Sequence, residues 1–270
     1  MAQRAHDLAL GFVNSVRHDP RKQYSAIAVA ALASLMLGRI AWKDYRLFLS
    51  YGPGGLPSNV FGWTATNILR LMGIDMTDVS KAEEDADQRS WLGEEWEPTK
   101  AKKSRDGSRP SVGPHPIPQR QLDQHGPKEV QQGPQEQKFL SDFVSLVKQN
   151  PDLVQFKLSQ YERHTDAMWV ADSCPVYALG SGHTREVSHV HTNTDYSAHV
   201  VLSPKDAAKV IRAGWGQLHA LSGVSFLGKK VVPANYVLLY SARSDDEVDT
   251  LIEIIKAGIG FMTDASVVRS

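Results

Sequence analysis

The sequence has almost no cysteine: Cys174 is the only one among 270 residues, so the fold cannot depend on an internal disulfide. It also has no excess of charge, because 30 Lys and Arg residues balance 30 Asp and Glu residues. A nucleic-acid-binding protein normally carries a basic patch, so no nucleic-acid partner is expected. The length and the absence of a repeat indicate one globular domain with appendages, stabilised by an apolar core.

Long apolar runs are also scarce, and the exception lies near the N-terminus. Residues 25–38 carry no charge, and the run continues through Arg39 to Trp42. A membrane-spanning helix needs about 20 mainly apolar residues, and Arg39 and Trp42 suit the headgroup region. We therefore predict an N-terminal tail over 1–24 and a transmembrane anchor over 25–42, with a buried core helix or a cleaved signal peptide as alternatives. Basic residues flank both ends of the run and leave its orientation open: Arg17, Arg21 and Lys22, then Lys43 and Arg46.

Two segments separate this run from the second half of the chain. Residues 43–97 are predicted to form a membrane-proximal helical segment. Helical spacing puts five of its apolar residues on one face, which favours packing on the domain over lying on a membrane: Phe61, Ala65, Ile68, Leu69 and Met72. Residues 98–137 are rich in Gln, Gly, Pro and charged residues, which predicts a disordered linker, with a docked turn around 91–96 just before it.

The remaining residues, 138–270, predict a compact α+β domain. Helical spacing of apolar residues begins at Phe139, and the alternation typical of a half-buried strand begins at Val154. A last helix begins at Ser244, where Ser244 and Glu247 have the spacing of a capping box. Further strands are predicted over 167–171, 176–179, 185–191, 197–202 and 236–240, and a helix from Pro204 to a stop at Gly214. The pattern indicates a mainly antiparallel sheet with packed helices.

Histidines give the strongest sign of chemistry. Six of the ten lie between residues 164 and 219: His164, His183, His189, His191, His199 and His219. Side chains alternate along a strand, so His189 and His191 point to the same face. If the next predicted strand pairs with theirs through a turn over 192–196, His199 joins them in one pocket. Imidazole has an unperturbed pKa of roughly 6.5, so it can accept and return a proton near neutral pH.

Three hypotheses fit this cluster. The first is a metal-free group that moves protons and orients a substrate. The second is a transition-metal site with open coordination positions, to which Glu186 could contribute, and the third is a set of histidines that only satisfy polar groups in a sheet. Arg185 and Glu186 stand on opposite faces of the predicted strand, so one could bind a substrate anion while the other is structural.

A second motif covers residues 213–223. Gly214 fits the stop of the preceding helix, and Gly216 lets the backbone pass close to a neighbour. Trp215 between them is either a core residue or a pocket wall. His219 is assigned equally to the pocket or to a structural role.

Several runs resemble the fungal luciferase family, whose luciferase-like domain belongs to the caffeic-acid light pathway. They are residues 185–191, 197–202, 214–219, 236–243 and 257–263, together with the apolar run and residues 44–53. A His-X-His run followed by a Gly-Trp-Gly-X-X-His run makes the resemblance fairly specific. It spans roughly residues 26–75 and 155–263 and omits the predicted linker.

The resemblance implies a membrane-anchored enzyme whose luminous relatives oxidise 3-hydroxyhispidin, a styryl pyrone, with O2 and without an organic cofactor or metal. The reaction would deprotonate the hydroxypyrone, add oxygen to form an endoperoxide, and lose CO2 to leave an excited product. We therefore predict a single-pass membrane protein located in the endoplasmic reticulum or another endomembrane. From this resemblance and the sequence patterns above, we predict two sets of site residues. The catalytic set is His189, His191, His199 and His219, and the substrate-binding set is Arg185, Glu186, Trp215 and His164.

Two other classes of function remain open at this point. The predicted linker and the turn over 192–196 depart from the luminous members, and luciferase-like domains also occur in fungi that emit no light. The same histidines would serve a hydrolase or lyase of secondary metabolism. A non-catalytic, membrane-tethered domain that binds a small molecule is the third possibility.

Overall fold

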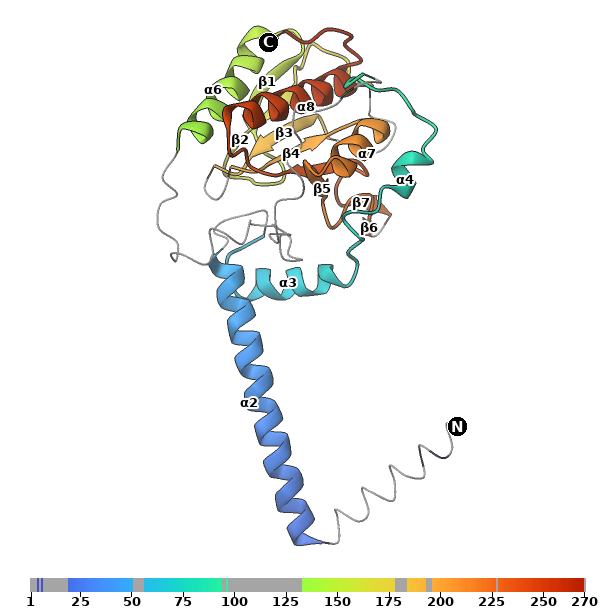
Figure 1. Cartoon of the computed structure of the whole chain (residues 1–270). Helices are drawn as coiled ribbons and strands as arrows, with labels where there is room; N and C mark the ends of the chain where they lie inside the picture. Colours follow the sequence, from blue (N-terminus) through green and yellow to red (C-terminus); the bar gives the residue numbers. More distant parts are fainter. Residues whose placement is uncertain are drawn as a thin grey trace. The chain divides into compact units, whose positions relative to one another are not determined.

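The computed structural model describes residues 19–50, 56–93, 96, 133–177, 184–192, 196–226 and 228–269, together with Arg4 and His6. The chain divides into two compact units, residues 1–49 and residues 50–270 (Figure 1). Most of the predicted linker over 98–137 lies outside the described residues, although helix α6 already begins at Pro134. The division into five segments stays a prediction.

Helix α2, Pro20–Ser50, contains the predicted anchor over 25–42. None of its 31 residues is buried. At about 1.5 Å per residue it measures about 46 Å, more than the roughly 30 Å of a hydrocarbon core. Among the described residues it is the one helix long and apolar enough to cross a membrane. Anchoring and orientation remain predictions, because a signal sequence or a core helix can have the same length and composition.

A six-stranded antiparallel sheet forms the centre of the second unit (Figure 1). Its spatial order is β1-β2-β3-β4-β8-β5, and every neighbouring pair is antiparallel. The strands are β1 Val154–Leu158, β2 Asp166–Val170, β3 Glu186–Val190, β4 Ala198–Val201, β5 Gly216–Leu218 and β8 Tyr236–Leu239, with a separate pair β6 Ser225–Phe226 and β7 Lys229–Lys230. The predicted α+β class is confirmed. The strand predicted over 176–179 is not: residues 176–177 are not in a strand, and 178–179 lie outside the described residues.

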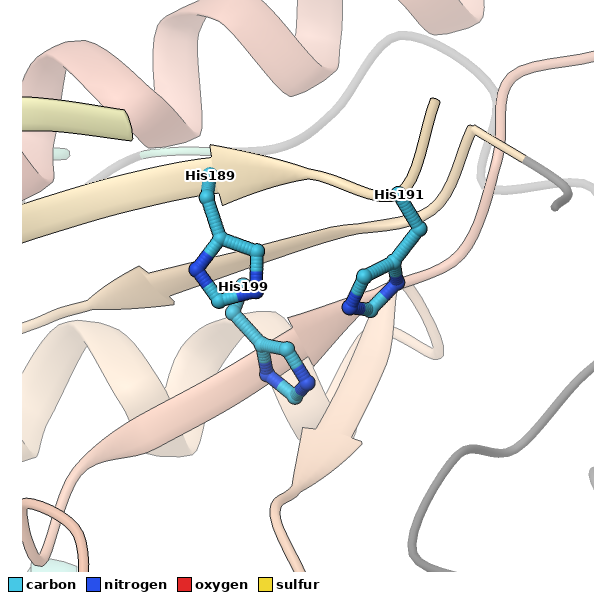
Figure 2. A group of neighbouring side chains, drawn as sticks. All are labelled: His189, His191 and His199. Carbon is cyan, nitrogen blue, oxygen red and sulfur yellow. The ribbon is translucent and has the colours of Figure 1, made fainter. Parts of the chain in front are cut away.

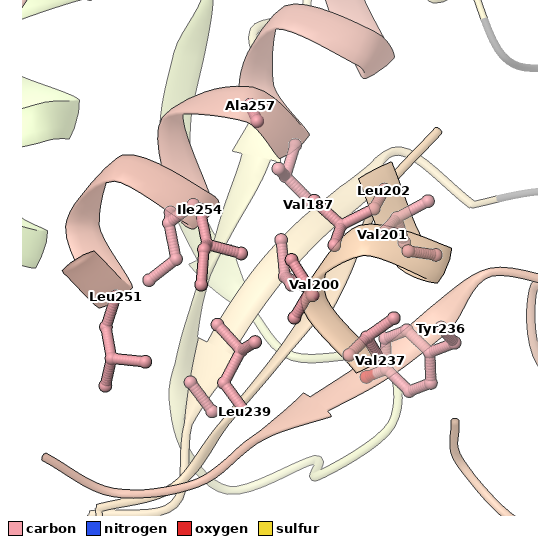
Figure 3. Packing of buried hydrophobic residues seen from close by; sticks show 14 of the residues in the cluster. Val187, Val200, Val201, Leu202, Tyr236, Val237, Leu239, Leu251, Ile254 and Ala257 are labelled. Carbon is pink, nitrogen blue, oxygen red and sulfur yellow. The ribbon is translucent and has the colours of Figure 1, made fainter. Parts of the chain in front are cut away.

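Helix α8, Asp245–Thr263, packs on one face of this sheet (Figure 3). Sheet residues such as Val200 and Leu239 meet helix residues such as Leu251 and Ile254 in the apolar core. A Cβ added at Gly258 would lie 2.6 Å from Val200 Cγ2 and 2.9 Å from a backbone oxygen of β4, so the helix backbone lies directly on the strand. Helix α6, Pro134–Gln149, packs against α8 and β1.

Helix α7, Pro204–Arg212, begins and ends as the sequence predicts. Ser203 accepts a hydrogen bond from the backbone N–H of Asp206, and Pro204 occupies the first turn. At the other end Gly214 has a φ of +80°, which suits glycine and stops the helix.

Helix α3, Val60–Arg70, corrects one prediction. Leu69 and Met72 pack against the core as expected, but Phe61 is 83% exposed and Ile68 59% exposed. The buried residues of the helix are Gly62 and Thr66, and Gly62 lies so close to a carbonyl of Pro57 that no side chain would fit there. Two of the five residues on the expected apolar face are thus exposed, and Gly62 and Thr66 form the buried side of the helix instead.

Residues 74–93 cross the second unit as a strap that is bonded at both ends. At its start, Ile74 N donates to Ala220 O and Leu218 N donates to Met76 O. At its end the buried carboxylate of Asp206 accepts from Ser90 Oγ at 2.5 Å and from Trp91 N at 2.8 Å. Trp91 lies edge-on against Phe261, with the ring centroids 5.6 Å apart. The strap includes helix α4, Ser80–Glu83, and the docked turn predicted around 91–96 lies at its end, where Trp91 and Trp96 pack against the core.

The predicted N-cap of α8 is confirmed, and it supplies a stability prediction. Ser244 Oγ accepts from Glu247 N at 3.3 Å, while the Glu247 carboxylate accepts from Arg243 N rather than from Ser244 N. Ser244→Ala removes the acceptor for one N–H of the first turn. We expect the free energy of unfolding to fall by about 1 kcal/mol, measured by chemical denaturation in detergent. Ser244→Asp keeps an acceptor and should unfold like the wild type; equal losses in both variants would contradict the capping role.

Candidate functional site

Two neighbouring strands bring three histidines together on one face of the sheet. His189 on β3 stands directly opposite His199 on β4, and His191 follows the last residue of β3. The backbone N–H of His191 donates to the carbonyl oxygen of Ser197, so the hairpin continues beyond β3. The pairing that the sequence predicted is present, although residues 193–195 of the connecting turn lie outside the described residues.

The three imidazole rings are buried and close to one another (Figure 2). Their ring centroids lie 5.2 Å apart for His189 and His191, 5.3 Å for His189 and His199, and 5.0 Å for His191 and His199. The exposed fractions are 1% for His189, 7% for His191 and 2% for His199. One ring nitrogen from each lies within 4.8 Å of those of the other two.

A β-bulge adds a carboxylate to this face. The pairs across β2 and β3 are Met168 with Ser188, and Trp169 with Glu186. Val187 is therefore an extra residue in β3, and it packs in the core beside α8 (Figure 3). Strict alternation would place Glu186 and His189 on opposite faces, because they are three residues apart. The extra residue shifts the alternation by one, so both side chains lie on the histidine face.

Glu186 is fully buried and is held by three donors. Its carboxylate accepts from Ser159 Oγ at 2.9 Å and from Gln160 N at 2.6 Å, and its Oε1 lies 2.7 Å from His189 Nδ1. A carboxylate can only accept, so Nδ1 of His189 carries a proton, and in the neutral ring the lone pair lies on Nε2. The carboxylate thus fixes the tautomer of His189 and leaves Nε2 as a base or ligand atom.

A second buried carboxylate, Glu162, lies between His191 of the cluster and one further histidine, His164. Glu162 is 5% exposed; its Oε2 lies 3.1 Å from His164 Nε2 and its Oε1 3.4 Å from His191 Nε2. His164 is one-quarter exposed, so these three side chains lead from the buried cluster toward solvent. His164 is therefore connected to the cluster through Glu162 rather than by lying among the three rings.

Two tyrosines border the cluster. Tyr236 on β8 stacks on His199, with ring centroids 4.5 Å apart and planes 11° apart, and its hydroxyl lies 3.3 Å from His189 Nδ1. Burial raises the pKa of Tyr236 well above its usual value and raises that of Tyr161 to about 12; the negative charge of Glu186 adds to both shifts. Both phenols therefore stay protonated near neutral pH.

His219 extends the cluster by one ring. It follows β5, and its ring centroid lies 5.4 Å from that of His199 and 5.8 Å from that of Tyr236. Its Nδ1 accepts from the backbone N–H of Leu221, so in the neutral ring Nε2 carries the proton and can donate to a bound oxygen. His219 is half-buried, unlike the three central rings.

The other two predicted substrate contacts have structural partners. Trp215 is 6% exposed and belongs to the apolar core, and its carbonyl accepts from Tyr240 N. The guanidinium of Arg185 donates to the carbonyl oxygens of Ala171 and Cys174 and ties the start of β3 to the segment after β2. Substrate binding by either residue stays a prediction. His183 lies outside the described residues.

The sequence did not point to four of the residues that surround the histidines: Tyr161, Glu162, Ser197 as a hydrogen-bond partner, and Tyr236. Glu162 carried a usable signal, because an acidic residue two positions before a clustered histidine is a candidate partner for it. Tyr236 carried none, since its contact with His189 joins residues 47 apart.

Comparison with known proteins matches the region of the chain that holds the histidine cluster. A family model described as a luciferase domain matches residues 184–258, which include all four clustered histidines, Glu186 and Tyr236. The chain is 30% identical over 251 residues to a luciferase of Armillaria mellea, covering 88% of this chain and 86% of the relative. It is 29% identical over 241 residues to a luciferase of Neonothopanus nambi, covering 86% and 85%.

No solved structure matches the chain, so the fold and site described above have no experimental counterpart to compare with. The luciferase relatives, by contrast, are matched over 85–86% of their own length. The chain therefore belongs to the fungal luciferase family.

Proposed function

We propose that the chain is an enzyme that oxidises a small hydroxypyrone or related aromatic polyketide with O2 at the histidine face of the sheet. One observation carries this proposal: four imidazoles, two buried carboxylates and a buried tyrosine converge on one face. Such groups can take a proton from an acidic hydroxyl and hold the resulting oxyanion. The luciferase relatives support an oxidation that ends in light.

The reaction begins with loss of a proton from the substrate hydroxyl. His191, Glu162 and His164 form a connected series from the buried cluster to a partly exposed ring, which suits them to carry that proton outward. His219 can donate from Nε2 to the enolate oxygen. Addition of O2 to the enolate carbon and ring closure give an endoperoxide, and loss of CO2 leaves the excited product. No organic cofactor takes part, and O2 is the co-substrate.

Low water content around the product would favour emission over quenching. The rings of His189, His199 and Tyr236 are each at most 2% exposed, so they offer a dry wall on one side of the reacting molecule. The candidate membrane span α2 would hold this site at an endomembrane. The partners we propose are thus a small molecule and a lipid bilayer.

The experiment measures oxygen uptake and photon emission together after adding 3-hydroxyhispidin to membranes that contain the full-length protein. Light with oxygen uptake supports a luciferase, and oxygen uptake in the dark supports a related oxygenase. If neither occurs although the substrate binds, the chain is a binding domain; if the substrate is consumed without oxygen, it is a hydrolase or lyase. Membranes from cells without the protein are the control.

A further inference from the structure

The three central histidines have the arrangement of a metal-binding site. One ring nitrogen from each of His189, His191 and His199 lies within 4.8 Å of the other two, and all three side chains are buried. Imidazole is a common ligand of zinc, copper, iron and nickel, and three such ligands leave coordination positions open for a substrate or water. A fourth imidazole, His219, adjoins the group through His199.

We infer that His189, His191 and His199 bind one divalent first-row transition-metal ion. This departs from the expectation, drawn from the family resemblance, that no metal is needed. The site rests on the positions of the three rings and not on the identity of the substrate, so it stands or falls separately from the proposed oxidation. A hydroxypyrone oxygen or a water molecule would take the open positions.

The surroundings of His189 match those of a metal ligand. Glu186 Oε1 lies 2.7 Å from His189 Nδ1, and this carboxylate is itself fixed by Ser159 and Gln160. Metal-bound histidines usually donate their second ring N–H to a carboxylate or carbonyl, which orients the ring and makes the ligand nitrogen more basic. His189 Nε2, the nitrogen left for the metal, is buried and has no hydrogen-bond partner among the described residues.

His191 has a similar arrangement. Its Nδ1 lies 2.9 Å from Ser197 Oγ, which fixes the ring from the side of the hairpin. Its Nε2 lies 3.4 Å from Glu162 Oε1, so a carboxylate oxygen stands next to the candidate ligand atom. An ion on this nitrogen would take His191 out of the proton path, and Glu162 would then be placed to accept the proton directly from a metal-bound water or substrate hydroxyl and to pass it to His164. Two of the three rings are thus oriented by a second residue.

The spacing fits an ion after a small movement. Nitrogen ligands at 2.0–2.1 Å from a tetrahedral ion are separated by about 3.4 Å. The candidate nitrogens, at up to 4.8 Å, need to approach by up to about 1.4 Å. We infer that rotation of the side chains about χ1 and χ2 supplies this movement, since the register of the strands already places His189 opposite His199.

The test is metal content of the full-length protein, purified in detergent without chelators and with an affinity tag that contains no histidine. After equilibration with Zn²⁺, Fe²⁺, Mn²⁺ or Cu²⁺ and removal of free ion, we expect about one ion per chain for at least one metal by elemental analysis. His189→Ala and His199→Ala should each lower this to below about one-tenth. His164→Ala, which removes a nearby histidine outside the proposed ligand set, should keep the full ion.

A second measurement, the melting temperature, distinguishes loss of metal binding from failure to fold. Because an ion that binds only the folded state stabilises it, adding the metal should raise the melting temperature of the wild type and of His164→Ala. Adding the metal should leave the melting temperature of His199→Asn, a variant of similar volume, unchanged. Less than one-tenth of an ion per chain in the wild type for all four metals, or full binding by His189→Ala, would overturn the inference. Neither result depends on turnover of 3-hydroxyhispidin.

Discussion

His191→Ala should lower the rate of substrate oxidation by about 100-fold or more while the protein remains folded. His191 lies between the other central rings and Glu162: its ring centroid is 5.0–5.2 Å from theirs, and its Nε2 is 3.4 Å from Glu162 Oε1. Removing it breaks the connection between the cluster and His164. The measurement is the initial rate of oxygen uptake at saturating substrate, in detergent.

The fold should tolerate this change, because His191 lies just beyond the last residue of β3 and its backbone bond to Ser197 does not involve the ring. The matched control is Thr192→Ala, the next residue, which is half-buried and has no part in the proposed chemistry. Circular dichroism and the melting temperature should be similar for both variants and the wild type. A folded His191→Ala protein with an unchanged rate would remove this residue from the mechanism.

Gly258→Leu should lower the free energy of unfolding by about 3 kcal/mol or more. In most helices, replacing glycine with a good helix former is stabilising by about 1 kcal/mol. Here the new Cβ would stand 2.6 Å from Val200 Cγ2 and 2.9 Å from the carbonyl oxygen of Val201. The second neighbour is backbone and cannot rotate away, so the helix or β4 must move. Chemical denaturation of the full-length protein in detergent measures the loss.

A leucine introduced at an exposed position of the same helix is the control. Glu253→Leu, five residues earlier on α8, points to solvent and should change the free energy of unfolding by less than about 0.5 kcal/mol. The variant Val200→Ala combined with Gly258→Ala should lose less free energy of unfolding than the sum of the two single variants, because the first close contact is removed. Equal stability of Gly258→Leu and the wild type would mean that α8 does not lie on β4.

The part of the site that follows from strand periodicity was predictable from the sequence. His189, His191 and His199 share a face because side chains alternate and the two strands pair as a hairpin. The position of Glu186 could not be predicted in this way. Alternation places it on the face opposite His189, and only the bulge at Val187 brings it to the histidine face. A bulge depends on how two strands pair, which local patterns do not encode.

Close backbone contacts are a second feature that the pattern of apolar residues does not reveal. In α3 the helical spacing predicted a helix correctly, yet Phe61 and Ile68 are exposed and Gly62, which packs against Pro57, is buried instead. The helices α7 and α8 were predictable at their ends because caps are local: Ser203, Gly214 and Ser244 each act within a few residues.

The strap over residues 74–93 also determines how the domain would respond to cleavage of the chain after it. Its bonds to Asp206, Leu218 and Ala220 join it to the second half of the domain, and α6 re-enters the core from Pro134 onward. Residues 97–132 thus connect two segments that the domain already holds by non-covalent contacts. A chain cut within them would yield two fragments that complement each other: one with α2 and the strap, the other with every strand and the whole histidine cluster.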